Sequence, residues 1–329
     1  MAKMTKKTRV FMLGSAAVLV GGICAGLVAY VTGMSAGLLA QSGPSAAELR
    51  YVPADAVGVG YANVREIMDS DLRRRLEALR PEGGSLDHDD FERQTGIKLE
   101  TDVDRAVVAM MPRQGDGEGD GFAIVTGRFN PTQLEAFARE HGGTVEEYRG
   151  VRIVEGGQER KAALAFIESG VLAIGGRAAV RRAIDTRESG QNVQANVDLM
   201  RLVGDVEMGS SAWAVGHFDD LASQAPLPEG VSSQIPPIQW LSVAGHVQDG
   251  LQGTLRAETR DEQAASDLRD TARGLLAFLR LQSASQPEFG GALEGLQIGG
   301  DGRTVAISFT LPAQAIDAFL SRDRQKAND

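Results

Sequence analysis

The amino-terminal 47 residues constrain this chain most, because they contain an uncharged apolar segment of membrane-spanning length. Residues 10–47 carry no charge, and residues 10–31 have Ser15 as their only strongly polar side chain. As an α-helix, residues 10–31 would rise about 33 Å, enough to cross a hydrocarbon core of about 30 Å. The sequence therefore predicts a transmembrane helix over residues 10–31.

The charges around this segment predict its orientation. The first acidic residue of the chain is Glu48, and the segment is preceded by four basic residues, Lys3, Lys6, Lys7 and Arg9. Basic flanks stay on the cytoplasmic side of a membrane. We therefore expect a single-pass signal anchor with a cytoplasmic amino terminus, the lipid bilayer as a partner, and an extracytoplasmic domain after it.

Two other interpretations of the segment stay open to test. A cleaved signal peptide usually has a shorter apolar region, of about 7 to 15 residues, although Ser35-Ala36-Gly37 suits a cleavage site. A lipoprotein would use Cys24, but the bulky Ile23 before it does not fit such a processing site. Cys24 is the only cysteine, so the exported part can form no disulfide and depends on its core.

Composition excludes several classes of protein. Hydrophobic residues make up 43% of the chain, which is enough for a large buried core. The chain has 34 basic and 44 acidic residues, and without the basic amino terminus the remainder carries a net charge of −14. Such a surface repels phosphate backbones, so we expect no nucleic-acid partner.

Apolar runs of strand length alternate with helical patterns along the rest of the chain. Residues 41–50, with Gly43-Pro44, are typical of a linker. Strands are expected at 56–62, 106–111, 122–126, 151–154, 162–167, 171–174, 212–218, 240–247, 251–257, 296–298 and 305–309. Several of these runs are separated by short turns, which indicates antiparallel hairpins. The expected fold class is α+β rather than a doubly wound parallel sheet.

Helix starts separate several of these strands. Asn63 can cap a helix with apolar positions through Leu79, and Asn130-Pro131 begins a second helix. A third helix is expected after Gly175-Gly176, and a short one begins at Asp219. The longest runs from Asp261 to about Leu281, with Ala264, Leu268, Ala272, Leu275 and Leu279 at helical spacing, and a last helix begins at Pro312.

The two halves of the exported part resemble each other. Residues 57–63 are similar to residues 213–219, and both precede a helix, two strands and a helix. A second similarity, between residues 131–137 and 312–319, pairs different elements. Because the two registers conflict, duplication remains a hypothesis.

The domain boundaries follow from these patterns. We expect a cytoplasmic basic segment at 1–9, the transmembrane signal anchor at 10–31 and a linker at 32–50. Two similar antiparallel-sheet-plus-helix halves follow at 51–206 and 207–329.

Local motifs for chemistry are weak. The G-x-S-x-G string at 33–37 lies at the end of the apolar segment, without the strand and helix of a nucleophile elbow. The acidic loop at 115–121 lacks the twelfth-position acid of a calcium loop. Asp87–Asp90 collects one histidine and three acids, but consecutive residues point in different directions, and Arg73–Arg75 is expected to be a solvated helix face.

The histidines show no metal-ligand spacing. His217 lies near Asp219 and Asp220, while His141 and His246 stand alone, so structural roles are favoured. The exported part also contains no P-loop and no H-E-x-x-H string. The sequence therefore predicts no local catalytic, cofactor-binding or metal site, and it leaves open a site assembled from distant residues.

Three stretches resemble a bacterial family. The stretches are YVPADAVGVGYANVREIM from Tyr51, AFIESGVLAIGGRAAVRRAID from Ala165 and GGDGRTVAISFTLPAQAIDAFL from Gly299. They resemble uncharacterised bacterial envelope proteins, classed as domains of unknown function, over most of residues 51–321. The resemblance implies export and an α+β fold, and it implies no catalytic residue.

These observations favour a non-catalytic, membrane-tethered interaction or scaffold domain in the periplasmic space of a bacterial envelope, held at the inner membrane. An envelope protein is the expected partner, and exposed Leu227, Val231, Ile235 or Ile238 would support one. The alternatives are an exported hydrolase and a ligand-binding module with a site between the two halves.

Overall fold

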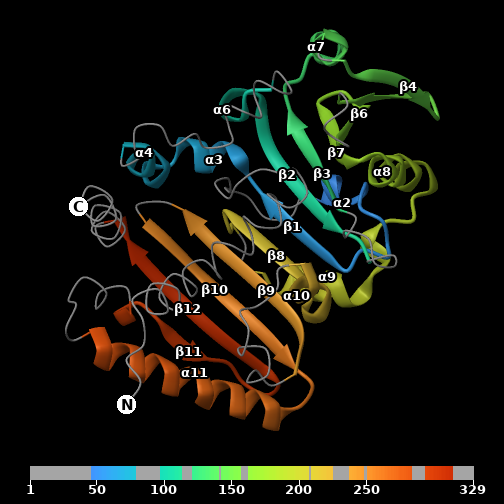
Figure 1. Ribbon diagram of the computed structural model, residues 1–329. Helices are drawn as coiled ribbons and strands as arrows, with labels where there is room; N and C mark the ends of the chain where they lie inside the picture. The colour runs from blue at the N-terminus through green and yellow to red at the C-terminus, as the bar shows by residue number, and fades with distance from the viewer. Residues whose placement is uncertain are drawn as a thin grey trace.

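One antiparallel sheet of 12 strands organises the computed structural model. The structure describes residues 46–78, 97–112, 121–140, 142–156, 162–206, 209–224, 237–247, 250–283 and 293–313. The strand order is β11-β12-β10-β9-β8-β1-β2-β3-β7-β6-β5-β4. Figure 1 shows this sheet running from the β12 end at lower left to the β4 end at upper right. The expected α+β class, with antiparallel hairpins and helices, is confirmed.

The strands of the first half lie on one side of the sheet centre. They are β1 (Gly58–Ala62), β2 (Val103–Met110), β3 (Gly121–Gly127), β4 (Thr144–Tyr148), β5 (Val151–Glu155), β6 (Ala162–Glu168) and β7 (Val171–Gly176). The second half supplies β8 (Ala212–His217), β9 (Ile238–Val247), β10 (Gly250–Thr259), β11 (Gln297–Gly299) and β12 (Thr304–Pro312). All the expected strands are present, and β4 is an addition to them.

The two halves meet where β1 pairs with β8. Tyr61 is opposite Trp213 in this antiparallel pair, and their rings stack with centroids 5.8 Å apart. Gly58 is opposite Gly216, where an added Cβ would lie 3.1 Å from the Gly58 Cα. Small residues at this point allow close packing of the two backbones. The halves therefore form one continuous sheet rather than two separate ones.

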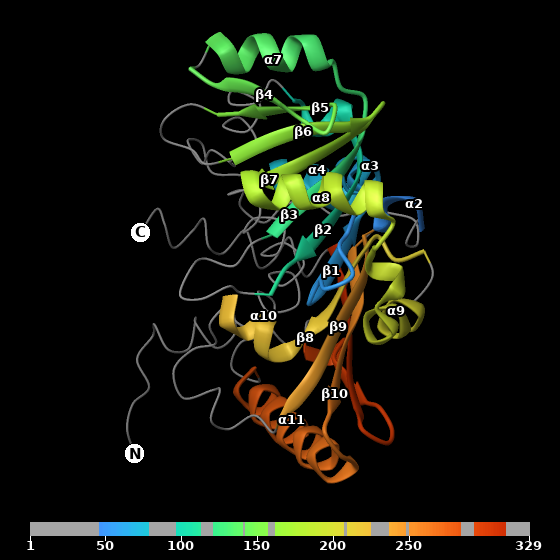
Figure 2. The same cartoon turned by 90° about the vertical axis from the view of Figure 1, so that its right-hand side faces the viewer.

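Helices cover both faces of the sheet. One face carries α2 (Ala46–Leu49), α8 (Arg177–Ser189), the 3-10 turn η1 (Val193–Ala195) and α9 (Val197–Gly204). The other face carries α3 (Val64–Asp69), α4 (Asp71–Ala78), α7 (Pro131–Glu140), α10 (Phe218–Gln224) and α11 (Glu262–Ser283). A short helix, α6 (Leu99–Asp102), precedes β2. Figure 2 shows α9 and α11 on opposite sides of the sheet.

The helix expected after Asn63 is divided into α3 and α4. Ser70 ends α3 in an extended conformation, and its hydroxyl donates to the Ile67 carbonyl while accepting from the Arg73 N–H. Serine competes with the helical backbone in this way. The expectation of one continuous helix after Asn63 is therefore wrong. In contrast, Asn130 caps α7 as expected, because its side chain accepts from the Gln133 N–H at 3.2 Å.

The folded part begins before Tyr51. Residues 46–49 fall in the expected linker, yet they form α2, in which Glu48 and Leu49 are buried. Arg105 on β2 pairs with Glu48 at 3.0 Å, so the sheet fixes this short helix. No described helix is both long and apolar enough to span a membrane, and the predicted span at 10–31 lies outside the described residues.

Candidate functional site

Helix α11 is attached firmly at its amino-terminal end. Asp261 precedes the helix, and its carboxylate accepts from the Ala264 N–H at 2.9 Å. That hydrogen bond and the nearby Arg260 hold the pKa of Asp261 below its ordinary value of 3.8. Ala264 and Ala265 in the first turn are buried where the helix packs on β10, β11 and β12. Small side chains there bring the helix close to the sheet.

The carboxyl-terminal half of α11 borders an open groove. The groove encloses about 730 Å³ and is lined by Arg273, Leu276, Ala277, Arg280, Leu281 and residues 296–298. Gln297 and Ile298 belong to β11, the strand at the end of the sheet, and Leu296 directly precedes it. We call this feature the α11 groove. Its volume is within the range of about 300 to 1,000 Å³ that small-molecule sites usually have.

Large apolar side chains are exposed along the same part of α11. Leu275 is 51% exposed, Phe278 48% and Leu281 78%. Among the residues that the structure describes, the other large hydrophobic side chain this exposed is Val197 on α9, at 78%. Leu281 lines the α11 groove, whereas Leu275 and Phe278 are not among its lining residues. An exposed apolar side chain in a concave apolar surface is typical of interaction sites, whereas an isolated one such as Val197 is ordinary.

Two arginines line the groove, and they differ in their partners. Arg280 donates to the carbonyls of Leu293 and Leu296 at 3.0 and 3.2 Å, so it fixes the segment that enters β11. Arg273 pairs with Asp270 at 3.3 Å, and both side chains are mainly exposed. An exposed pair of this kind contributes little to stability, so Arg273 can exchange its partner for a ligand anion.

A Ser-His-acid trio from distant positions occurs near the seam. The Ser211 hydroxyl donates to Glu66 at 3.1 Å and accepts from the Val247 N–H at 2.9 Å. Burial raises the pKa of Glu66 above its ordinary 4.5, while the Ser211 hydrogen bond and the charge of His246 oppose the shift. A serine nucleophile needs a base that takes its proton and needs access to substrate. Ser211 is 1% exposed and donates to a carboxylate, so these residues hold α3, β8 and β9 together.

His217 and its neighbouring acids form a surface pair. His217 Nδ1 lies 3.1 Å from Asp220, and the imidazole meets the Trp240 ring edge to face at 5.2 Å. No group of three or more potential metal ligands occurs within the described ranges. The contacts of His217 are thus with Asp220 and Trp240.

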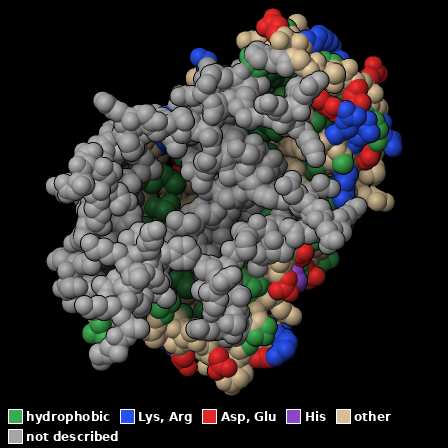
Figure 3. All heavy atoms as spheres, in the orientation of Figure 1, with side chains coloured by type: hydrophobic (Ala, Val, Ile, Leu, Met, Phe, Trp, Pro, Cys, Tyr) green, Lys and Arg blue, Asp and Glu red, His purple; other side chains and the backbone are tan. Residues whose placement is uncertain are grey.

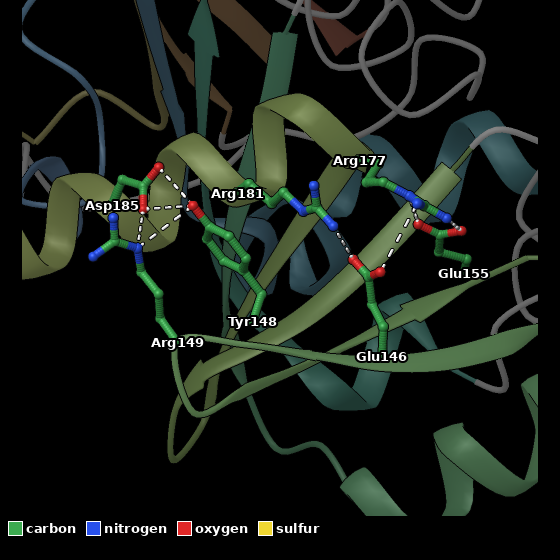
Figure 4. A network of polar contacts seen from close by, with 7 residues as sticks. All are labelled: Glu146, Tyr148, Arg149, Glu155, Arg177, Arg181 and Asp185. Carbon is green, nitrogen blue, oxygen red and sulfur yellow. Dashed lines mark hydrogen bonds and ion pairs between the residues drawn. The ribbon is translucent and has the colours of Figure 1, made fainter.

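A third polar cluster joins the β4–β5 hairpin to α8. The Tyr148 hydroxyl donates to Asp185 at 3.0 Å, and Arg149 also pairs with Asp185 at 2.7 Å. Arg181 pairs with Glu146 at 2.7 Å while its guanidinium lies 4.9 Å from the Tyr148 ring centroid. Figure 4 shows these contacts, with Arg177 between Glu146 and Glu155. Because each arginine of this cluster pairs with a carboxylate, the cluster holds the hairpin against α8 and offers no site for an anion.

The surface near β4 shows the same matching of opposite charges. In Figure 3, basic and acidic side chains are interleaved at upper right, over the region of α7, α8 and β4. Within that region Arg152 also pairs with the buried Glu135 of α7 at 3.1 Å. Matched pairs of this kind leave no concentration of one charge there.

Several residues singled out from the sequence fall outside the described residues. These are the string at 33–37, Asp87–Asp90, His141, most of the acidic loop at 115–121, and Leu227, Val231 and Ile235. Among the described ones, Arg74 is exposed and pairs with Asp71, and Ile238 lies in β9 at intermediate exposure. His246 lies in β9 beside the seam.

The α11 groove is the feature that the sequence analysis missed. Leu275 was expected on the buried face of the long helix, and its 51% exposure corrects that expectation. The signal is the position of Phe278 and Leu281 outside the helical stripe that contains Leu275. A helix whose apolar surface is wider than the sheet it meets leaves part of that surface uncovered.

A solved structure is similar to this chain. No family model matches the chain, and no curated protein matches it. The solved structure of TP0453, in its crystal form I, matches with a TM-score of 0.47 and 13% sequence identity. The alignment covers 83% of this chain and 96% of TP0453.

Proposed function

We propose that this chain is a membrane-tethered, non-catalytic binding domain of the bacterial envelope, and that the α11 groove is its binding surface. The observation that carries the proposal is the groove itself, open and mainly apolar, with Leu281 of its lining 78% exposed. Uncovered apolar surface in a soluble domain costs free energy that binding recovers.

The polar clusters support a non-catalytic role. Ser211 is buried and donates to Glu66, and Tyr148 donates to Asp185 within a set of matched ion pairs. Neither arrangement presents a nucleophile with its base to solvent. The hydrolase alternative therefore has less support than binding, and the groove lies in the second half rather than between the halves.

The tether is part of the same proposal. The predicted span ends at residue 31, and the described fold begins at residue 46 with the docked helix α2. Fourteen intervening residues can reach about 50 Å at most when fully extended. An anchored domain would therefore work close to the outer surface of the inner membrane.

The finer proposal is that the two halves arose by duplication. From the seam outward, β1-β2-β3 in one half corresponds to β8-β9-β10 in the other. In each half the last strand along the chain, β7 or β12, then pairs with the third. This order supports the register that relates residues 57–63 to 213–219. A superposition of the halves that required different strand pairing would overturn it.

A photo-crosslinking experiment tests the binding surface. The full-length protein in its native membranes would carry p-benzoylphenylalanine at Leu281, with Val197 as the matched control because both side chains are 78% exposed. We expect a reproducible adduct, identified by mass spectrometry, at position 281 and not at 197. Equal adducts at both positions, or none at 281, would contradict the proposal.

A further inference from the structure

We propose that the α11 groove binds a single-chain anionic amphiphile, namely an acyl chain that ends in a carboxylate. This inference rests on the proposed function and names the class of ligand for the same surface. It combines two properties of the groove, an apolar lining and a pair of arginines on one side of α11.

The lining suits an acyl chain. Leu276, Ala277 and Leu281 on α11 face Leu296 and Ile298 across the groove. These five of the eight lining residues are aliphatic, so they offer dispersion contacts and removal of methylenes from water, with few directional bonds. The groove is bordered by about two turns of helix, because residues 273–281 rise about 12 Å. An acyl segment fits this length, whereas a stable protein interface buries roughly 1,600 Å² in total.

The arginines suit the anionic head. Arg273 and Arg280 are seven residues apart, so two helical turns bring them to the same side of α11. Arg280 donates to two carbonyls, which are neutral acceptors and leave the guanidinium charged. Arg273 has an exposed partner in Asp270. A carboxylate can accept a charge-assisted, two-point hydrogen bond from such a guanidinium.

The net negative charge of the chain makes the two arginines at the groove significant for anion binding. Outside its basic amino terminus the chain carries a net charge of −14, so its surface repels anions in general. An anion that settles at the groove must therefore be held locally, by Arg273 and by apolar contacts. A neutral amphiphile makes only the apolar contacts of the groove, and a short anion makes only the contact with Arg273.

The test uses full-length protein in native inner-membrane vesicles and a hexadecanoic acid analogue that carries a photoreactive diazirine and an alkyne. Illumination followed by peptide mapping should place adducts on the groove, within residues 274–281 or 296–298. The corresponding hexadecanol analogue, which has the same chain without the charge, should give about three- to tenfold less labelling there.

Matched variants separate the two contributions. Arg273→Gln should reduce labelling of the groove by about three- to tenfold, and Arg74→Gln should not, although Arg74 also pairs with an aspartate three residues away. Leu281→Asp should abolish labelling, and Val197→Asp should leave it unchanged. Hydrogen exchange of β12 checks that each variant keeps its fold.

The outcomes distinguish this inference from the proposed function. Equal labelling by the acid and the alcohol, or no effect of Arg273→Gln, would overturn the assignment of an anionic ligand. Absence of groove adducts from the acid, with a protein still crosslinked at position 281, would overturn the amphiphile and retain a binding surface. Absence of both kinds of adduct would overturn both proposals.

Discussion

The two ends of the sheet differ in how a helix covers them. At the β4 end, α8 places Val180, Ala183 and Ile184 against the sheet, and all three are fully buried. At the β11 end, α11 is buried at Ala264 and Ala265, whereas Leu275, Phe278 and Leu281 later in the helix are exposed. The longer helix therefore packs less completely than the shorter one.

Polar contacts follow the same division. Arg177, Arg181 and Arg149 on the β4 side all pair with carboxylates of facing elements. On the β11 side, Arg280 donates to backbone carbonyls and Arg273 pairs within its own helix. One end thus has its charges neutralised across elements, while the other keeps arginines beside an apolar groove. This difference is the basis of our proposal that the second end is a binding surface.

The largest expected effect tests whether the two ends are coupled at all. Trp213→Ala removes a fully buried indole that stacks on Tyr61 at the seam, which should lower the free energy of unfolding by about 3–5 kcal/mol. Because β1 and β8 belong to one sheet, hydrogen exchange should accelerate in both α8 and α11. Retained protection in α8 alone would show that the halves unfold independently.

A second prediction compares the two helices directly. Ile184→Ala on α8 should lower the free energy of unfolding by about 2–4 kcal/mol, because the side chain is fully buried. Leu275→Ala on α11 should cost less than about 1 kcal/mol, because half of that side chain is already in water. Denaturant titration of both variants in parallel measures the difference. Similar losses would mean that α11 is covered as well as α8.

Much of the fold could be predicted from local pattern. Strand lengths, the Asn130 cap and the hairpins follow from apolar runs and turn residues, and they gave the α+β class. The division at Ser70 and the helix α9, capped by Asn196, were missed because short helices depend on single side-chain hydrogen bonds. The pairing of β1 with β8 was also missed, since no local signal states which strands become neighbours.

The candidate site could not be predicted for a similar reason. Periodicity identifies apolar residues on a helix, but it does not say whether another element covers them. Leu275 and Ala264 follow the same pattern, yet the first is 51% exposed and the second is buried. The groove also combines α11 with residues 296–298, which are distant in sequence. Only the placement of β11 at the sheet end brings them together.

A third prediction compares the polar contacts at the two ends. Glu135→Ala removes a buried carboxylate that accepts from Arg152 and Arg139, and should lower the free energy of unfolding by about 2 kcal/mol. The arginines are largely exposed and can be rehydrated, so the loss should be smaller than for a wholly buried pair. Arg273→Gln should change it by less than about 0.5 kcal/mol. Equal effects in denaturant titrations would remove this distinction between the ends.

The smallest expected effect concerns the attachment of α11. The pKa of Asp261 lies below 3.8 in the folded state, because the carboxylate accepts from the Ala264 N–H and lies near Arg260. As the pH falls towards 3.8 and below, the Asp261 carboxylate is therefore protonated more readily in the unfolded chain than in the folded one. The stabilisation by this carboxylate is present at neutral pH and is lost as the pH falls through the folded pKa.

Asp261→Ala should lower the melting temperature slightly at neutral pH, and the difference from the wild type should narrow at pH values below 3.8. Asp261→Asn keeps an acceptor without the charge and should reduce the pH-dependent part alone. A constant difference between wild type and Asp261→Ala across this range would show that the carboxylate charge does not help to hold α11, and the contrast between a firmly attached first turn and an open groove would then rest on Ala264 and Ala265 packing.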